Sequence, residues 1–384
     1  MRRFDSVSQR YDVVIVGAGA AGCAAAIALL QQMPQLTVLL LERNGAALQQ
    51  FRIGETLPPQ TAVLFQQLGL LESFQARGDM PALGTRSYWG GAQVNENPFL
   101  YSFYGHGWHI DRVAFDCWMM RQAEAAGATV IKGAVLTGAP EYDERWRLTV
   151  NRNDAESMTI DAPLVIDASG RGAAFCRSLG IRANKLDKLM GIFRFFQADN
   201  GAGDRVVDSF TLVESSADGW WYSADLPHGR RVAALMTDSD LVRDLKVLDE
   251  KGWHRAMARA RQTCKRFVNT RPLTPLQVRP SHSQYLKRFS GTGWYAAGDA
   301  ATLFDPLSSL GIFKAIRHGV LASYAVRDDL QGKPGAGQKY HHVLQSEFEH
   351  YLRTRRNYYA MEGRFAGAPF WQRRQEGRLT EITA

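Results

Sequence analysis

Cysteine is scarce in this 384-residue chain, which contains only four. They stand at positions 23, 117, 176 and 264, and no two of them form a CxxC pair or another metal-type spacing. A disulfide framework and a structural zinc site are therefore not expected, and we predict no metal site. Such sparse cysteine is also typical of a reducing compartment, so the sequence predicts a cytoplasmic protein.

The chain also lacks a strongly hydrophobic run. Residues 13–30 carry no charge over about the length that spans a bilayer. The centre of this segment, residues 17–22, consists only of Gly and Ala, which are too small for a membrane anchor. A strand, a tight turn and a helix fit the segment better. No basic segment with a plausible cleavage site accompanies it, so neither a membrane span nor a secretory signal is expected.

A nucleic-acid-binding module is missing too, although the net charge is +8. The basic residues are scattered apart from short runs such as 353–356, so nucleic acid is not an expected partner. Long-range attraction instead favours an acidic partner or substrate. Hydrophobic content of 45% and charged content of 22% indicate a folded globular protein, long enough for two domains or one with a large insertion.

The N-terminal stretch YDVVIVGAGAAGCAAAIALL places a GxGxxG pattern between an apolar run and an alanine-rich helix. Gly17 permits a tight turn, Gly19 lets the backbone approach a pyrophosphate, and Gly22 allows the helix to pack closely on the strand. A second apolar run ends at Glu42, whose carboxylate can accept hydrogen bonds from ribose hydroxyls. The pattern predicts a dinucleotide-binding βαβ unit without distinguishing FAD from NAD.

Further motifs follow in a characteristic order. FRIGETLPP carries a Gly-Glu-Thr turn, GWHIDR places Asp111 and Arg112 before a predicted helix, PLVIDASGRG ends a strand at Asp167, and a GDA motif follows near residue 300. Together with GxGxxG, they resemble the FAD-dependent monooxygenases of the aromatic-hydroxylase class and the related tryptophan halogenases. The resemblance covers most of the chain to about residue 330. It implies FAD, bound non-covalently.

The last motif, GDAATLFDPLSSLGIFKA, has two expected parts. In the resembling families the Asp of GDA, here Asp299, accepts a hydrogen bond from a ribityl hydroxyl. Residues 306–311 would form a turn before a helix, whose free N–H groups and dipole favour the negative charge of a reduced flavin. An ordinary surface loop capped by Ser308 or Ser309 is the alternative. The cofactor-binding residues predicted in this way are Gly17, Gly19, Ala20, Ala21, Gly22, Glu42, Arg43, Arg52, Glu55, Thr56, Arg112, Ala168, Gly170, Gly298, Asp299, Pro306, Ser308, Ser309, Gly311 and Ile312.

The resemblance implies an α/β fold, in which a Rossmann-type FAD-binding domain carries an inserted, mostly antiparallel β-sheet substrate domain and C-terminal helices. The FAD-binding domain is expected over 1–88, 106–175 and 286–330, the substrate-side sheet over 89–105 and 176–285, and a helical segment over 331–384. Four stretches of the sheet domain are spaced like strands of a meander, at 191–197, 208–215, 219–227 and 230–238.

Hydroxylation, halogenation and reduction of isolated double bonds share this scaffold. Halogenases of the resembling family relay hypochlorous acid through a lysine soon after the GE turn, and this chain has no lysine before Lys132. Arg86 is the nearest cation, but a guanidinium stays protonated and is a poor nucleophile. The halogenase signature WxWxIP is missing as well. The expected reaction is therefore hydroxylation of an indole or phenol through a flavin C4a-hydroperoxide.

Hydroxylation of this kind requires a dry, shaped pocket more than particular side chains, so catalytic residues leave little trace. The candidates are His106, His109, Arg86 and Trp89. The two histidines and Trp89 also have a simpler explanation as structural residues. No second nucleotide-binding motif is present. Electrons would therefore come from NAD(P)H in transient contact or from free reduced flavin.

Among the monooxygenases, FRIGETLPP, WWYSADLPHGRRVAALMTD and DPLSSLGIFKAI look most similar to the flavoproteins that mature tryptophylquinone cofactors. These are the maturases of lysine and glycine oxidases and of quinohemoprotein amine dehydrogenase. The likeness implies that the substrate is a tryptophan side chain of a partner protein, the precursor of a quinone enzyme. A small aromatic substrate is the alternative.

The basic, aromatic C-terminal stretch 351–375 would suit docking of an acidic partner, or it would pack its aromatic side chains on the core. Three other functions remain open beside the monooxygenase. They are a flavin reductase of the geranylgeranyl type, a flavin-dependent halogenase, and a maturation scaffold in which FAD is mainly structural.

Overall fold

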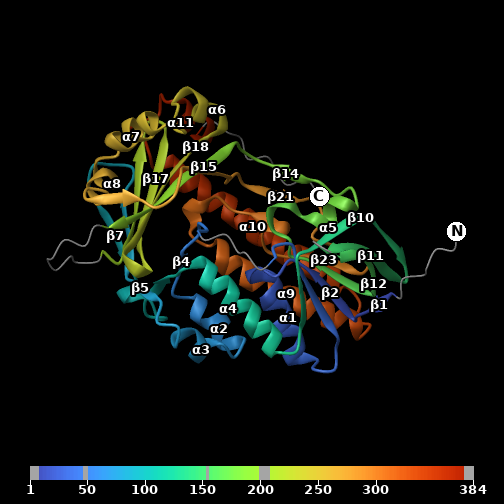
Figure 1. Cartoon of the computed structure of the whole chain (residues 1–384). Helices are drawn as coiled ribbons and strands as arrows, with labels where there is room; N and C mark the ends of the chain where they lie inside the picture. The colour runs from blue at the N-terminus through green and yellow to red at the C-terminus, as the bar shows by residue number, and fades with distance from the viewer. Residues whose placement is uncertain (1–7, 46–50, 153–154, 199–207, 376–384) are drawn as a thin grey trace.

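A computed structural model describes residues 8–45, 51–152, 155–198 and 208–375 (Figure 1). One half of the molecule is built on a six-stranded sheet with the order β22-β23-β13-β2-β3-β9, parallel except for the short β22. Strands buried on both faces read as unbroken apolar runs, as VVIV in β2 does. The strands are β2 (Val13–Val16), β3 (Val38–Glu42), β9 (Thr129–Lys132), β13 (Leu164–Asp167), β22 (Ser290–Gly291) and β23 (Trp294–Ala296).

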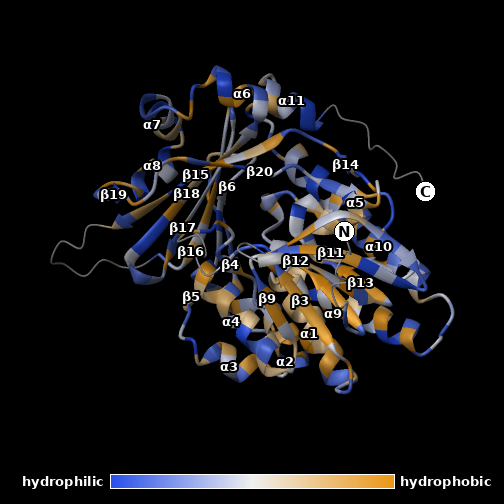
Figure 2. Cartoon of the chain, turned by 45° about the vertical axis from the view of Figure 1, so that its right-hand side comes forward, coloured by the Kyte–Doolittle hydropathy of each residue, from blue (hydrophilic) through white to orange (hydrophobic). Residues whose placement is uncertain are grey.

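Helix α1 (Ala20–Gln32) packs between α4 (Arg112–Ala125) and α9 (Gly311–Leu330) beside this sheet (Figure 1). The helices approach closely because the residues where they touch have small side chains. A Cβ on Gly319 of α9 would lie 2.2 Å from the carbonyl oxygen of Ala21 in α1. Figure 2 shows hydrophobic residues concentrated in α1, β3 and β9. This core holds the N-terminal βαβ unit together with the helix near residue 311.

The other half is built on an eight-stranded sheet, which we call the roof sheet. Its order is β19-β15-β18-β17-β16-β6-β7, with β20 paired to β15. The four expected strands are present as β15 to β18, but β15 pairs with β18 and not with β16, so they do not form a simple meander. The strands are β6 (Gly84–Tyr88), β7 (Asn95–Pro98), β15 (Leu189–Ala198), β16 (Phe210–Ser216), β17 (Gly219–Leu226), β18 (Arg230–Asp238), β19 (Thr270–Pro272) and β20 (Gln277–Pro280).

Strand β6 shows where the two halves interlock. It lies inside residues 1–88, which were expected to belong to the FAD-binding domain, yet it pairs in parallel with β16 of the roof sheet. The small sheet β4-β8-β5 connects the halves, because β4 follows the Gly-Glu-Thr turn and β8 leads into α4. Its strands are β4 (Thr56–Leu57), β5 (Met80–Ala82) and β8 (Gly107–His109).

The remaining elements surround these two sheets. Two further sheets contain β1 (Gln9–Arg10), β10 (Ala134–Asp143), β11 (Arg145–Arg152) and β12 (Ala155–Ala162), and β14 (Ala183–Lys185), β21 (Gln284–Leu286) and β24 (Thr302–Leu303). The shorter helices are α2 (Thr61–Gln67), α3 (Leu71–Gln75), α5 (Ala174–Ser178), α6 (Ser239–Asp244), α7 (Glu250–Arg259) and α8 (Arg261–Arg266). Single 3-10 turns are η1 (Phe99–Tyr101), η2 (Gly170–Gly172), η3 (Pro227–Gly229), η4 (Gly298–Ala300) and η5 (Pro306–Ser308).

The C-terminal helices are α10 (Ala336–Ala360) and α11 (Pro369–Gln375). Tyr359 of α10 and Trp371 of α11 are buried and pack on Trp89 beside the roof sheet, with ring centroids 5.8 and 5.2 Å from it. Most aromatic side chains of 351–375 therefore pack on the core, one of the two roles considered for this stretch, while Tyr358, Arg353 and Arg356 are exposed.

The expected fold class is confirmed: the chain combines a Rossmann-type parallel sheet, a second mostly antiparallel sheet and C-terminal helices. None of the helices in the described ranges is long and apolar enough to cross a membrane.

Candidate flavin and substrate site

The Gly-rich turn between β2 and α1 has the geometry of a phosphate cradle. Gly17 has a φ of +107°, which L residues rarely adopt. A Cβ on Gly22 would lie 1.9 Å from the carbonyl oxygen of Gly17, so only glycine lets α1 begin so close to the turn. A Cβ on Gly19 would meet nothing within 4 Å. Open space therefore lies before the first N–H groups of α1, at Ala20 and Ala21.

Glu42 ends β3 beside this turn. Its Oε2 accepts a hydrogen bond from the Ala18 N–H at 3.1 Å, and its Oε1 accepts two from Asn44. The carboxylate is thus oriented next to the cradle, and its recognition of a ribose stays a prediction. The neighbouring Arg43 is exposed.

The loop after β13 packs against the cradle. A Cβ on Gly17 would lie 2.4 Å from the carbonyl oxygen of Ala168. The fully buried Asp167 orders this loop, because its carboxylate accepts hydrogen bonds from both donors of Ser169 and from the Cys176 N–H. Gly170 follows with a φ of +77°. The expected loop residues Ala168 and Gly170 therefore lie beside the dinucleotide-binding turn.

The GDA motif returns to the same place from the far end of the sequence. A Cβ on Gly298 would lie 2.8 Å from the Cβ of Ala21, in the first turn of α1. The Asp299 carboxylate is partly exposed and forms an ion pair of 2.9 Å with Lys314 Nζ. Lys314 is 1% exposed and also donates a hydrogen bond to the Thr302 carbonyl oxygen.

Lys314 was not among the predicted site residues. Its only signal in the sequence is a single lysine within the apolar stretch GIFKAI. Since a buried ammonium group requires partners, a lysine at such a position indicates a nearby carboxylate. The structure identifies that carboxylate as Asp299.

Residues 306–311 form η5 and the start of α9, as the sequence predicts. Ser309 has a φ of +52°, and Ser308 Oγ accepts a hydrogen bond from the Leu310 N–H at 3.3 Å. Neither serine caps α9, which begins at Gly311 without a side-chain cap and buries Ile312. The structure therefore lacks a serine cap on α9, and the binding of the flavin ring by this turn stays a prediction.

The buried Asp305, directly before the turn, connects it to the C-terminal helix α10. Its Oδ2 accepts hydrogen bonds from Arg355 Nε at 3.2 Å and from the Tyr359 hydroxyl at 2.8 Å. Its backbone N–H donates to the Tyr351 hydroxyl at 2.7 Å. All three partners lie on α10, so the C-terminal helix fixes the position of the turn. The sequence did not reveal this network, because nothing local pairs residues about fifty positions apart.

Two arginines from separate segments share one carboxylate at the other side of the cradle. Arg52 pairs with Asp116 at 2.5 Å and Arg112 pairs with it at 3.3 Å. Arg112 also donates to the carbonyl oxygen of Gly54 at 3.0 Å, and its buried Nε has no hydrogen-bond partner. The neighbouring charge of Arg112 lowers the pKa of Arg52. This surplus of positive charge would favour an anion such as a diphosphate.

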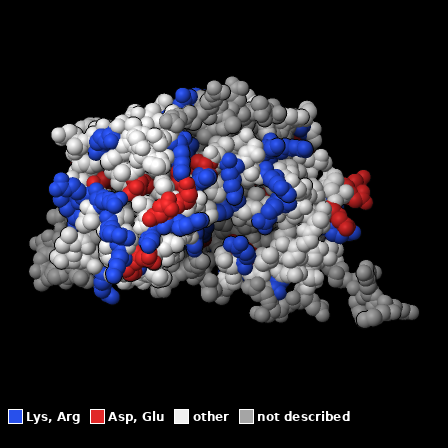
Figure 3. Space-filling model, turned by 90° about the horizontal axis from the view of Figure 1, so that it is seen from above, with Lys and Arg blue, Asp and Glu red and all other residues white. Residues whose placement is uncertain are grey.

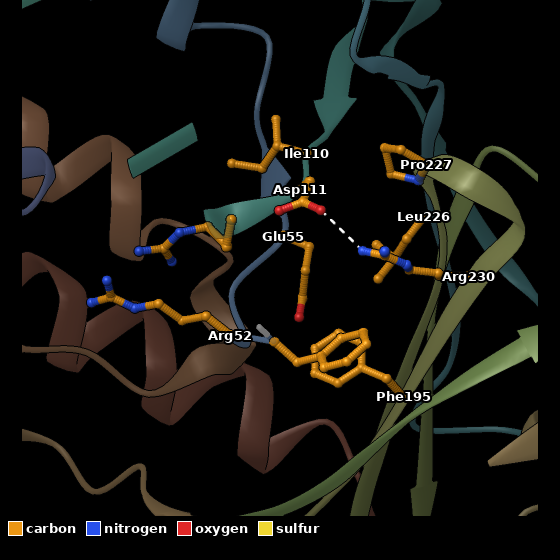
Figure 4. A pocket seen from close by; sticks show the side chains of 10 residues that line it. Arg52, Glu55, Ile110, Asp111, Phe195, Leu226, Pro227 and Arg230 are labelled. Atoms are coloured by element: carbon orange, nitrogen blue, oxygen red, sulfur yellow. Dashed lines mark hydrogen bonds and ion pairs between the residues drawn. The ribbon is translucent and has the colours of Figure 1, made fainter. Parts of the chain in front are cut away.

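A pocket lies between these arginines and the roof sheet (Figure 4). The ion pair of Asp111 with Arg230, at 3.0 Å, links its two sides. Glu55 lines this pocket, whereas the next residue, Thr56, contacts His109 Nδ1 and the Tyr222 hydroxyl at 3.0 and 3.1 Å. The described lining residues include no lysine: Phe51, Arg52, Glu55, Ile110, Asp111, Arg112, Phe195, Leu226, Pro227 and Arg230.

None of the four candidate catalytic residues lines this pocket. His109 is buried, which lowers its pKa to about 4, and its two ring nitrogens face Thr56 and the Ser209 carbonyl oxygen. His106 is exposed. Arg86 pairs with Glu96 and Asp208, and Trp89 donates to the Tyr358 carbonyl oxygen at 2.7 Å inside the aromatic core. His109, Arg86 and Trp89 therefore have structural roles, and a catalytic role for any of the four stays an untested prediction.

These residues fit FAD. The open space at Gly19 suits a pyrophosphate, the buried Nε of Arg112 lacks a partner, and the partly exposed Asp299 has acceptor capacity for a ribityl hydroxyl. The family model described as FAD binding domain matches residues 10–354. The chain belongs to this family. It is a FAD-dependent oxidoreductase, related to flavin-dependent monooxygenases and halogenases.

Named relatives span nearly the whole chain. A putative FAD-dependent oxidoreductase, LodB, of Marinomonas mediterranea is 28% identical over 95% of this chain and 97% of its own length. The myxobacterial chondrochloren halogenase CndH has a similar structure, with a TM-score of 0.87 and 21% identity over 97% of this chain and 87% of its own. The peptidyl tryptophan dihydroxylase QhpG, essential for tryptophylquinone cofactor biogenesis, has a TM-score of 0.75 and 23% identity. The match covers 98% of this chain and 80% of QhpG. At these identities the structural likeness establishes the fold alone.

Proposed function

We propose that this enzyme is a monooxygenase that hydroxylates an aromatic ring, and that its substrate is a tryptophan side chain of a partner protein during tryptophylquinone biogenesis. The pocket in Figure 4 carries the proposal. Apolar side chains from both halves of the molecule meet there, beside the arginines that fit a diphosphate. Reduced FAD, replenished by NAD(P)H or by free reduced flavin, would supply the activation of dioxygen. The protein's own side chains would supply a dry, shaped site for the ring.

Halogenation is the second candidate, because CndH is a halogenase with a closely similar fold. Two observations favour hydroxylation. The described residues that line the pocket include no lysine to serve as the amine relay. Lys314, the buried lysine near the expected flavin turn, is already engaged by Asp299 and Thr302.

A protein substrate is supported by an exposed apolar segment on the described surface. Leu100, Tyr101 and Phe103 are 83%, 85% and 102% exposed, and Tyr104 is half exposed. Contiguous exposed aromatic side chains are typical of protein-binding surfaces. The segment leads directly into β8, which pairs with β4 next to the pocket residue Glu55. We therefore propose residues 100–104 as part of the surface that binds the partner protein.

The charge of the chain supports a partner with an acidic surface. The net charge is +8, and Lys and Arg side chains are spread widely over the face seen in Figure 3. Opposite charge on a partner would raise the rate of encounter more than the final affinity. QhpG is named as acting on peptidyl tryptophan, which supports the same class of substrate here.

The test is a mass measurement on a co-expressed partner. FAD-loaded protein is produced together with a tryptophylquinone-enzyme subunit precursor, in air and with chloride present, and the tryptophan-containing peptides are analysed. Gain of oxygen on one tryptophan supports the proposal. Chlorine in place of hydrogen would instead establish a halogenase. An unchanged partner that still binds would indicate a scaffold. Reduction of an alkene by the protein without oxygen would indicate a reductase.

A further inference from the structure

The Glu55 carboxyl group is buried in the pocket without a hydrogen-bond partner. The residue is 2% exposed, and neither Oε1 nor Oε2 is within hydrogen-bond geometry of a described donor. Figure 4 shows its side chain directed toward Phe195, with the ion pair of Asp111 and Arg230 nearby. An unsatisfied buried carboxyl group is costly, so its retention requires an explanation such as a ligand.

The polar groups around Glu55 already have other partners. Arg112 is held by Asp116 and the Gly54 carbonyl oxygen, and Arg230 by Asp111. Tyr222 bonds to Thr56. Arg52 pairs with Asp116. Burial raises the pKa of this carboxyl to about 7, although the backbone N–H groups of Gly54 and Glu55, the nearby Arg112 charge and the Tyr222 hydroxyl each act to lower it.

The apolar wall opposite Glu55 suits a flat ring. The rings of Phe51 and Phe195 are in contact there, with centroids 5.1 Å apart, and Leu226 also lines the pocket. A substrate ring would take a place against Phe195 by displacing the Phe51 ring. Aromatic surfaces of this kind bind rings through offset or edge contacts, while a single polar group fixes the orientation.

We propose that Glu55 and Phe195 form the recognition site for an aromatic ring that carries one N–H or O–H donor, with Glu55 accepting the hydrogen bond from that donor. Indoles and phenols belong to this class, and rings without a donor do not. The inference rests on the proposed function, since it names the chemistry by which the same pocket selects its substrate. It also gives Glu55 a role different from the cofactor contact predicted from the sequence.

The discrimination should be large because a polar group would be buried without a partner in the wrong complex. A site built to bond a substrate N–H rejects the analogue lacking it much more strongly than a purely apolar pocket does. We expect the FAD-loaded protein to bind 3-methylindole at least tenfold more tightly than 1,3-dimethylindole. The second probe has the same ring without the N–H donor.

Two variants separate recognition from folding. Glu55→Met removes both oxygens at similar volume, and we expect the preference for 3-methylindole to fall below twofold. Glu55→Gln keeps one acceptor, so the preference should persist. The change in 3-methylindole affinity that we expect for the wild-type protein between pH 6 and 8 should be absent in this variant. Glu141→Gln, on the exposed part of β10, is the control and should behave as the wild-type protein does.

Binding is measured by titration calorimetry on FAD-loaded protein, and FAD content and melting temperature are recorded for each variant. The inference is overturned if wild-type protein shows no preference for the N–H probe, if it binds neither probe, or if Glu55→Met keeps the preference. The proposed function is judged separately by the mass of the partner peptide. Hydroxylated tryptophan together with an unchanged preference in Glu55→Met would contradict the inference alone.

Discussion

The cradle around Gly17 to Gly22 and the pocket around Glu55 are built by opposite means. The cradle is made of backbone and glycine positions, and its close contacts join residues whose motifs the sequence displays. The pocket is made of side chains from β15, β17, β18, η3, the start of α4 and the segments before β4 and α4, and the ion pair between Asp111 and Arg230 links its two sides. Backbone geometry requires particular residues at fixed spacing, whereas a pocket lined by side chains can be formed by many different combinations of residues.

Substitutions in the cradle and in the pocket should also change the stability of the protein for different reasons. In the cradle, glycine removes steric conflict, so a substitution harms the fold or the cofactor site at once. In the pocket, Glu55 is kept at some cost in stability, so Glu55→Met should stabilise the protein while impairing substrate recognition. The following experiments test this contrast.

The largest effect is expected for Gly22→Val. The first side-chain carbon alone would lie 1.9 Å from the Gly17 carbonyl oxygen, so α1 must shift away from the turn. We expect a loss of about 3 kcal/mol in the free energy of unfolding and loss of FAD. Absorbance of the purified protein near the flavin band and urea unfolding measure both. Gly363→Ala is the control, because a Cβ there meets nothing within 4 Å.

Glu55 should make the stability of the protein depend on pH. Burial raises its pKa from 4.5 to about 7 in the folded chain, so between these values the folded state binds more protons than the unfolded state. The free energy of unfolding contributed by this group therefore falls as pH rises from about 4.5 to 7, by up to about 3 kcal/mol. Glu55→Gln should lack this decline and be the more stable protein at pH 8. Equal slopes of stability against pH for the two proteins would contradict the prediction.

Lys314→Met tests the link between the GDA motif and α9. The substitution leaves the Thr302 carbonyl oxygen without this donor and Asp299 without this ion pair. We expect a loss of about 1–3 kcal/mol in the free energy of unfolding and weaker FAD binding. The matched control is Lys333→Met, which removes an exposed ion pair with Asp328 and should cost less than about 1 kcal/mol. A Lys314 variant as stable as the control would show that the buried pair contributes little.

Gly19→Val separates the cofactor site from the fold. Gly19 has ordinary extended dihedral angles, φ −78° and ψ −174°, and a Cβ there has open space. The variant should therefore fold with a nearly unchanged melting temperature. Its FAD affinity should fall at least about tenfold, which corresponds to about 1.4 kcal/mol, because the side chain occupies the space expected for the pyrophosphate. Full retention of FAD would place the pyrophosphate elsewhere.

The smallest effect on stability is expected for the exposed segment 100–104. The double variant Leu100→Ser and Phe103→Ser should change the free energy of unfolding by less than about 0.5 kcal/mol, since both side chains are exposed. Pull-down and modification of the co-expressed partner should weaken, while binding of 3-methylindole stays the same. Val268→Ser alters another exposed apolar side chain and should affect neither. Unchanged modification of the partner by the double variant would remove this segment from the docking surface.

Much of the fold could be predicted from local patterns. GxGxxG, the helix headed by Asp111 and the turn at 306–311 each leave a local sequence pattern, and all three elements are present as expected. The order of strands in the roof sheet was not predictable in the same way, because β15 pairs with β18 and β6 joins β16 through contacts far apart in the sequence. The network of Asp305 with α10 was missed for the same reason.

The sequence by itself predicted a dinucleotide site at a Gly-rich turn and a late GDA segment beside it, because glycine, helix starts and charged residues at strand ends leave patterns in one dimension. Only the tertiary structure decided which side chains meet in the pocket. It buried Glu55 beside Phe195 and the ion pair of Asp111 and Arg230, with neither carboxyl oxygen in hydrogen-bond geometry with a described donor. Burial is a property of the whole packed chain, and an ionisable group acquires its chemistry from that burial.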